Sequence, residues 1–235
     1  MRIPLLLLTS AVVSVLLAGC ASGVRDDSQT SLPALTTPPT TRTTPSVPSV
    51  TSTSPRPVAT TPPGNGAAIS DVIGWIEAGT AASPDDYHSA TRDGSTTQLG
   101  DELAFVTSGG VANCVTNKYL DGALSCLVKL TDPPPRPPGV ETAWKDNWVD
   151  FTGTSVEVGS PHGDPGPFGN GSGTELIAGQ TLAFGDYRCR ADPAGLFCVN
   201  YAHQSAVRLS AAGVEPFGCL KEATPSEGIG RQFSC

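Results

Sequence analysis

The chain has 235 residues, of which 14 are Lys or Arg and 22 are Asp or Glu, so its formal net charge is −8. After residue 66 there remain 10 basic and 20 acidic residues, a formal charge of −10 for that part alone. Because so acidic a surface repels nucleic acid and anionic lipid headgroups, we exclude a nucleic-acid partner. The acidity either serves solubility or favours a cationic partner.

The N-terminus has the pattern of an export signal. Arg2 precedes an apolar stretch from Ile3 to Leu17, which is shorter than the roughly 20 apolar residues that a membrane-spanning helix needs. The stretch ends in Leu17-Ala18-Gly19-Cys20, which resembles the cleavage motif of bacterial lipoprotein signal peptides. An ordinary secretory signal that is cut elsewhere and a retained helix are the alternatives.

This resemblance implies that residues 1–19 are removed and that the Cys20 thiol carries a diacylglycerol. Two or more acyl chains hold a protein firmly in a membrane, whereas a single chain binds only marginally. Later apolar runs, such as residues 123–130, are only long enough for strands. We therefore expect a lipoprotein that is anchored to the outer face of the cell membrane through the lipid on Cys20 alone.

A polar, proline-rich segment follows the lipidated cysteine and extends to residue 66. Of the 46 residues from 21 to 66, 27 are Ser, Thr or Pro. Such a composition cannot bury enough apolar surface to offset the entropy of ordering the chain. We expect residues 20–66 to be a disordered tether with a contour length of at most about 140 Å and a coil span nearer 40 Å. Its Thr-Pro clusters also suit O-glycosylation, although a bare spacer is equally consistent with them.

Six cysteines remain besides Cys20, and six cysteines in an exported chain allow 15 disulfide pairings. Two pairs flank turn signals between alternating apolar runs: Asp121-Gly122 in one case and residues 192–195 in the other. No Cys-x-x-Cys motif occurs, which argues against metal-binding pairs. We therefore predict the disulfides Cys114–Cys126, Cys189–Cys198 and Cys219–Cys235.

Residues 67–235 have the length of one domain and the pattern of a mainly β fold. Ser70 is expected to cap a short helix that runs to Glu77 and stops at Gly79. After this helix, short strand patterns recur roughly every 8–12 residues, which is typical of a small antiparallel β-sandwich or partly open barrel. We expect disulfides to staple this fold. The expected strands are 103–107, 111–116, 123–130, 148–151, 154–158, 181–184, 187–190, 196–201 and 205–209.

Two segments interrupt this pattern. Residues 133–138 read Pro-Pro-Pro-Arg-Pro-Pro, which predicts a stiff spacer between an early and a late part of the sheet, or else a proline-rich recognition sequence. Residues 159–173 contain many glycines and almost no side chain that can pack, apart from Phe168. We expect this segment to be a loop without secondary structure, either rigid or binding.

No motif for catalysis, a cofactor or a metal is present. The three histidines, His88, His162 and His203, form no His-Glu-x-x-His motif, and no Gly-x-Ser-x-Gly elbow occurs. His162 and Asp164 could form a catalytic triad only with a serine from elsewhere in the fold, because a triad requires proximity in space and not in sequence. We predict no catalytic residue, no cofactor and no metal site.

Several stretches resemble a module of secreted actinobacterial proteins. Its pattern is a strand with a cysteine, a short turn, Gly-Leu-Phe-Cys-Val-Asn at 195–200, and an aliphatic strand that ends in Ser210. Across residues 67–235 the chain resembles the LppI-like lipoproteins of mycobacteria, in the wider Lpp/Lpr group. This resemblance implies an envelope lipoprotein without an assigned catalytic activity, and Cys20 is the one position that it carries over. The matching stretches are 87–94, 122–126, 162–168, 186–201 and 206–210.

Together these features predict a membrane-tethered, non-catalytic module that binds an unknown ligand or protein of the cell envelope. The alternatives are an envelope hydrolase that uses a histidine with carboxylates, and an inhibitor of a lytic enzyme. A histidine clustered with Asp or Glu in a cleft would favour the hydrolase. A flat acidic face with an exposed aromatic residue would favour a protein ligand, and a large apolar cavity would favour lipid carriage.

Overall fold

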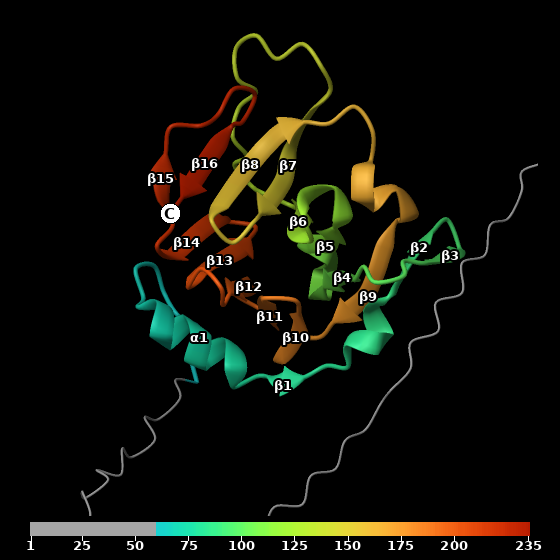
Figure 1. Ribbon diagram of the computed structural model, residues 1–235, viewed down its shortest axis with the longest axis vertical. Coiled ribbons are helices and arrows are strands. Elements are labelled where there is room, and N and C mark those ends of the chain that lie inside the picture. The colour runs from blue at the N-terminus through green and yellow to red at the C-terminus, as the bar shows by residue number, and fades with distance from the viewer. Residues whose placement is uncertain (1–59) are drawn as a thin grey trace, which may run out of the picture. The chain divides into compact units, whose positions relative to one another are not determined.

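The computed structural model describes residues 60–235 (Figure 1). The predicted signal peptide, the lipidated Cys20 and the tether up to residue 59 lie outside the described residues. Residues 60–66 lead into the first helix through a turn in which the Ala67 amide donates to the Gly64 carbonyl. From residue 60 onward, no helix has the length and apolarity that crossing a bilayer requires.

Residues 60–235 form two β-sheets and one α-helix, which confirms the prediction of a mainly β fold (Figure 1). The six-stranded sheet has the order β1 (Thr80–Ala81), β10 (Gln180–Phe184), β11 (Tyr187–Asp192), β12 (Gly195–Asn200), β13 (Ser205–Ser210), β14 (Gly213–Gly218). The ten-stranded sheet has the order β15 (Lys221–Ala223), β16 (Arg231–Ser234), β8 (Ser155–Pro161), β7 (Trp144–Phe151), β6 (Ala123–Val128), β5 (Ala112–Asn117), β4 (Ala104–Thr107), β9 (Ser172–Leu176), β2 (Ser89–Arg92), β3 (Ser95–Gln98). The α-helix is α1 (Ile69–Glu77), and the short 3-10 helices are Pro84–Tyr87, Ser108–Gly110, Lys118–Leu120 and Gly166–Asn170.

Each sheet is built around an antiparallel meander of five strands that follow one another along the chain: β4 to β8 in one, β10 to β14 in the other. The nine predicted strands all lie in these two meanders. In each meander a disulfide joins the second and third strands at directly opposite positions, Cys114 with Cys126 and Cys189 with Cys198. The local turn signals therefore predicted both the strands and their pairing.

The main core lies between the two sheets. The ten-stranded sheet contributes Phe105, Leu124 and Phe151, and the six-stranded sheet contributes side chains such as Leu182 and Leu196. Both meander disulfides are buried in this core. Alternation along the strands explains the arrangement, because successive side chains of a strand point to opposite faces of its sheet.

The helix α1 covers the outer face of the six-stranded sheet. Its buried residues Val72, Trp75 and Ile76 recur at helical spacing and pack against Phe197 of β12, among others. The Arg190 guanidinium lies 3.9 Å from the centre of the Trp75 ring and also donates to the Trp75 carbonyl oxygen. This cation–π contact fixes the helix to the sheet.

The predicted helix cap is wrong. The helix begins at Ile69, its N-cap residue is Ala68, and Ser70 lies inside the first turn. The cap makes no side-chain hydrogen bond, so packing of the apolar face determines where the helix starts. Gly79 follows the helix, and a Cβ there would come within 2.5 Å of the Thr181 side chain, which explains why glycine occupies this position.

The segment 159–173, expected to be a loop, is largely structured. Its first residues complete β8, a 3-10 helix spans Gly166–Asn170, and β9 starts at Ser172. Glycines are needed because β9 inserts between β2 and β4: a Cβ on Gly173 would lie 1.8 Å from the Ala104 carbonyl oxygen. At Gly159, Gly171 and Gly173 a Cβ would lie 2.7 Å or less from a neighbouring atom, so close contact requires glycine at these three positions.

The proline segment 133–138 joins β6 to β7, which are neighbours in the same sheet, so it does not cross from an early to a late part. The sequence also missed β1, β2, β3, β9, β14, β15 and β16. Two of these form parallel pairs, β1 with β10 and β4 with β9, in an otherwise antiparallel architecture. Strands such as β9 and β16 pair with segments far away in the sequence, so no local signal marks them. Strands β2 and β3 are different, because the Asp93-Gly94 turn between them is a local hairpin signal that the prediction missed.

Candidate functional site

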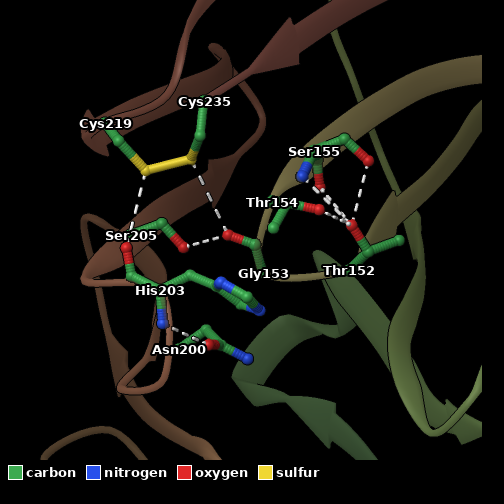
Figure 2. The surroundings of a disulfide bond; sticks show 9 residues. All are labelled: Thr152, Gly153, Thr154, Ser155, Asn200, His203, Ser205, Cys219 and Cys235. Atoms are coloured by element: carbon green, nitrogen blue, oxygen red, sulfur yellow. Dashed lines mark hydrogen bonds between the residues drawn. A yellow bond between two sulfur atoms is a disulfide. The ribbon is translucent and has the colours of Figure 1, made fainter.

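All three predicted disulfides are present, and they differ in exposure. The four cysteines of the meander disulfides are at most 1% exposed, whereas Cys219 and Cys235 are exposed. Cys219 follows β14 and Cys235 follows β16, so this bond ties the end of the chain to the six-stranded sheet (Figure 2). The bond is therefore the one that solvent reaches among the disulfides of the described residues.

The three histidines lie on different elements. The His88 ring bonds the Glu102 carbonyl oxygen at 2.9 Å, and the His203 amide donates to Asn200 in the turn between β12 and β13. His162 follows β8. Within residues 60–235, no group of three or more His, Cys, Asp or Glu side chains is placed to hold a metal ion.

His162 belongs to a polar cluster on the outer face of the ten-stranded sheet. Its ring stacks on Trp148, with 3.6 Å between ring centroids, and the Trp148 indole donates to the Asp150 carboxylate at 2.9 Å. The Ser125 hydroxyl donates to the same carboxylate, and Asn117 donates to Ser125 at 3.0 Å. This chain of hydrogen bonds links three neighbouring strands, β5, β6 and β7.

Burial dominates the electrostatics of this cluster. Burial raises the pKa of Asp150, although the hydrogen bonds from Ser125 and Trp148 and the nearby His162 oppose that shift. Burial likewise lowers the pKa of His162, while Asp150 and Asp164 act in the opposite direction. Both groups are thus pushed toward their neutral forms.

The cluster is closed to solvent around its serine. Ser125 is 0% exposed, Trp148 2% and Asp150 9%. A histidine does approach a carboxylate, as a hydrolase would require, but the arrangement is a network between strands in which the Ser125 side chain is closed to solvent.

A different place on the surface is hollowed and acidic. This acidic hollow has a volume of about 540 Å³ and lies where the loop before β4, the turn before β6 and the turn between β10 and β11 meet. One lysine, Lys118, lines it together with four acidic residues: Asp101, Glu102, Asp121 and Asp186. Its floor includes Tyr187, whose hydroxyl donates to the Phe151 carbonyl and whose pKa burial raises to about 12.

Two apolar side chains stand at the edge of the acidic hollow. Tyr119 is 76% exposed and Leu120 37%, and they account for two of the three large exposed apolar residues among those described. They are adjacent to the hollow because Lys118 and Asp121, on either side of them in the chain, both line it. We call Tyr119 and Leu120 the apolar edge.

The turn that carries the apolar edge is well fixed. The Asn117 side chain accepts from the Tyr119 amide at 3.0 Å, and the Glu102 carboxylate accepts from the Lys118 amide at 2.6 Å. Asp121 adopts the left-handed conformation that ends the 3-10 helix. Because the Lys118 and Tyr119 amides both have side-chain acceptors, the turn is a fixed support for the two exposed apolar side chains.

Part of this site was open to prediction. A tyrosine and a leucine between Lys118 and Asp121, inside a predicted hairpin turn, are an apolar pair in an exposed position, and this signal was overlooked. The meeting of Asp101, Asp121 and Asp186 was not predictable, because it depends on how the two meanders pack. The acidic surface beside the exposed Tyr119 is hollowed rather than flat.

Comparisons with known proteins give no match for this chain. No family model matches it. No curated protein matches it, and no solved structure does. The resemblance to the LppI-like lipoproteins stays a prediction.

Proposed function

We propose that this chain is a lipid-anchored protein of the cell envelope whose β domain is a non-catalytic binding module. The N-terminal motif that ends in Cys20 supports the anchor. The three disulfides use six of the seven cysteines and leave Cys20 as the one without a disulfide partner among them. A cysteine that the fold does not need is available for the lipid.

The contact surface in this proposal is the acidic hollow with its apolar edge, and the partner is a cationic protein segment that also carries an apolar side chain. The observation that carries the proposal is the exposure of Tyr119 and Leu120 beside four acidic residues. Exposed aromatic residues next to a pocket are typical contact residues of interfaces. The carboxylates would select a basic partner and speed its association.

Two synthetic peptides test the choice of partner. One carries Lys and Arg around a single Trp, and the other carries Glu at the basic positions. We expect the mature protein to bind the basic peptide and not the acidic one in a fluorescence titration. Replacing both Asp121 and Asp186 by Asn should weaken binding of the basic peptide by about tenfold, which is a loss of about 1.4 kcal/mol. Equal affinity for the two peptides would contradict the proposal.

The anchor has a separate test. Mass spectrometry of the mature N-terminus should find a chain that begins at Cys20 and carries acyl chains. A Cys20→Ser variant should leave the membrane fraction, because the lipid is proposed as the whole attachment. If this variant still partitions with membranes, lipid anchoring at Cys20 is refuted.

A further inference from the structure

The disulfide Cys219–Cys235 differs from the other two in its exposure to solvent, which holding the chain together does not require. Both of its cysteines are exposed, whereas the other four are sealed in the core between the sheets. Exposed disulfides are the labile ones, because thiol exchange requires access to a sulfur atom. We propose that Cys219–Cys235 is a thiol-exchange site that an exported dithiol reductant opens while the two core disulfides stay closed.

A surface hollow gives access to this bond. The hollow has a volume of about 500 Å³ and is lined by Cys219 itself, by the chain that enters α1 at residues 66–69, and by the turn that holds His203. We call it the Cys219 hollow. Its position on a surface distinct from the acidic hollow makes this inference independent of the proposed partner.

The charge of the Cys219 hollow suits a thiolate. Lys221 lines it, and none of the described residues that line it is Asp or Glu, although acidic residues outnumber basic ones two to one after residue 66. A nearby ammonium group favours the thiolate form, which is the nucleophile in thiol exchange. The hollow therefore attracts an anionic thiol in a protein that otherwise repels anions.

The exchange consists of two substitutions at sulfur. A thiolate of the reductant attacks the Cys219 Sγ from the hollow, the Cys219–Cys235 bond breaks, and Cys235 leaves as a thiolate that takes up a proton. The second thiol of the reductant then attacks the reductant sulfur that is bound to Cys219, and Cys219 is released as a thiol. Two electrons pass from the dithiol, which is oxidised to its own disulfide, to the protein disulfide, which is reduced.

The fold accommodates the reduced state. The Cys219 Sγ lies 3.5 Å from the His203 carbonyl oxygen and the Cys235 Sγ lies 4.0 Å from the Gly153 carbonyl oxygen, so each thiol has an acceptor at hand (Figure 2). Strand β16 is also held without the bond, since it pairs with β8 and places Phe233 in the main core at 2% exposure. Opening the bond removes the covalent tie between Cys235 and the chain after β14, while β16 keeps its pairing with β8 and the Cys235 amide still donates to the Thr154 carbonyl oxygen.

Timed reduction of the full chain tests the site. The protein is treated with dithiothreitol under native conditions, free thiols are trapped with iodoacetamide, and the labelled cysteines are identified by peptide mass spectrometry. We expect Cys219 and Cys235 to be labelled at least about 100-fold faster than the core cysteines, because a buried disulfide reacts only after local opening. Labelling of all six cysteines at one rate, or of a core pair first, would overturn the proposal.

A charge variant tests the route of approach. With dihydrolipoate, an anionic dithiol, Lys221→Glu should slow reduction of Cys219–Cys235 by roughly threefold or more, since the thiolate then approaches a negative charge. Lys129→Glu is the matched control: it makes the same charge change beside Gly109, beyond the opposite end of β13, and should leave the rate unchanged. Equal rates for the two variants would show that the reductant does not enter by the Cys219 hollow.

Discussion

At the scale of single residues, three positions in the segment 159–173 contribute to the packing of the ten-stranded sheet. His162 stacks on Trp148, and Phe168 meets the same indole ring edge-on at 4.9 Å. Gly173 lets β9 approach β4 more closely than any side chain would allow. His162 acts partly through its charge and Gly173 through its lack of a side chain, so different experiments test these two residues.

Replacing His162 by Phe should change how stability depends on pH. Burial lowers the pKa of His162, so the wild-type fold gains stability above the ordinary histidine pKa of about 6.5 and loses it as the pH falls through the lower folded value. Phenylalanine keeps a ring on Trp148 but does not titrate. In urea titrations at about pH 7.5 and pH 5, the variant should lose less stability on acidification than the wild type; a parallel loss would contradict this origin of the pKa shift.

Replacing Gly173 by Ala should destabilise the domain by about 1–3 kcal/mol or more, because the new Cβ would lie 1.8 Å from the Ala104 carbonyl oxygen and force β9 away from β4. Gly163 in the same segment is the matched control, since nothing lies within 4 Å of a Cβ there. Thermal unfolding followed by circular dichroism measures both variants. Similar melting temperatures for the two would show that β9 does not pack as described.

At the scale of elements, the C-terminal hairpin of β15 and β16 extends the ten-stranded sheet beyond β8. Its ladder with β8 runs from Arg231 opposite Val158 to Ser234 opposite Ser155, and the disulfide closes it onto the chain after β14. The hairpin is therefore held at both its paired edge and its end.

Replacing Cys219 and Cys235 together by Ser should lower the free energy of unfolding by about 3 kcal/mol, the chain-entropy value for a loop of this size, here a separation of 16 residues. The variant should still unfold cooperatively. Hydrogen exchange should rise in β16 and at its partner β8 and stay low in β11 and β12. An unfolded variant, or uniform exchange across both sheets, would contradict the view that this bond fixes only the hairpin.

Strands that pair with a close neighbour in the sequence could be predicted, whereas strands that pair over long distances could not. Strands β5 and β6, or β11 and β12, were predictable with their disulfides because a turn and its two strands lie within about twenty residues of one another. Strand β9 was not, because it pairs in parallel with β4 far earlier in the chain and contains glycines that only the close approach explains. For the candidate site, Tyr119 and Leu120 were visible in the sequence, whereas the approach of Asp186 to Asp101 depends on tertiary packing.

At the scale of the whole molecule, the excess of acidic residues after residue 66 gives the domain a formal charge of −10. Such a field steers cationic molecules, and added salt screens it. Four of the carboxylates meet at the acidic hollow, while the apolar edge beside it is insensitive to screening. The affinity for a partner that binds there should therefore depend only in part on the salt concentration.

Raising the ionic strength from about 0.05 to 0.5 M should weaken binding of the basic peptide several-fold without abolishing it, because the Debye length falls below 5 Å while apolar burial persists. Titrations at several salt concentrations measure this dependence. Complete loss of binding at high salt would mean that the peptide is held by nonspecific charge attraction, and no salt dependence would mean that the carboxylates take no part.

The central claim is that the acidic hollow and its apolar edge bind a cationic partner. It is tested most directly by titrating the basic peptide into the wild type, a Tyr119→Ala/Leu120→Ala variant and an Ile177→Ala control, whose side chain is 56% exposed beyond the opposite end of β10. We predict that the double variant binds about tenfold more weakly or worse and that the control binds like the wild type. The same affinity in all three proteins would contradict the claim.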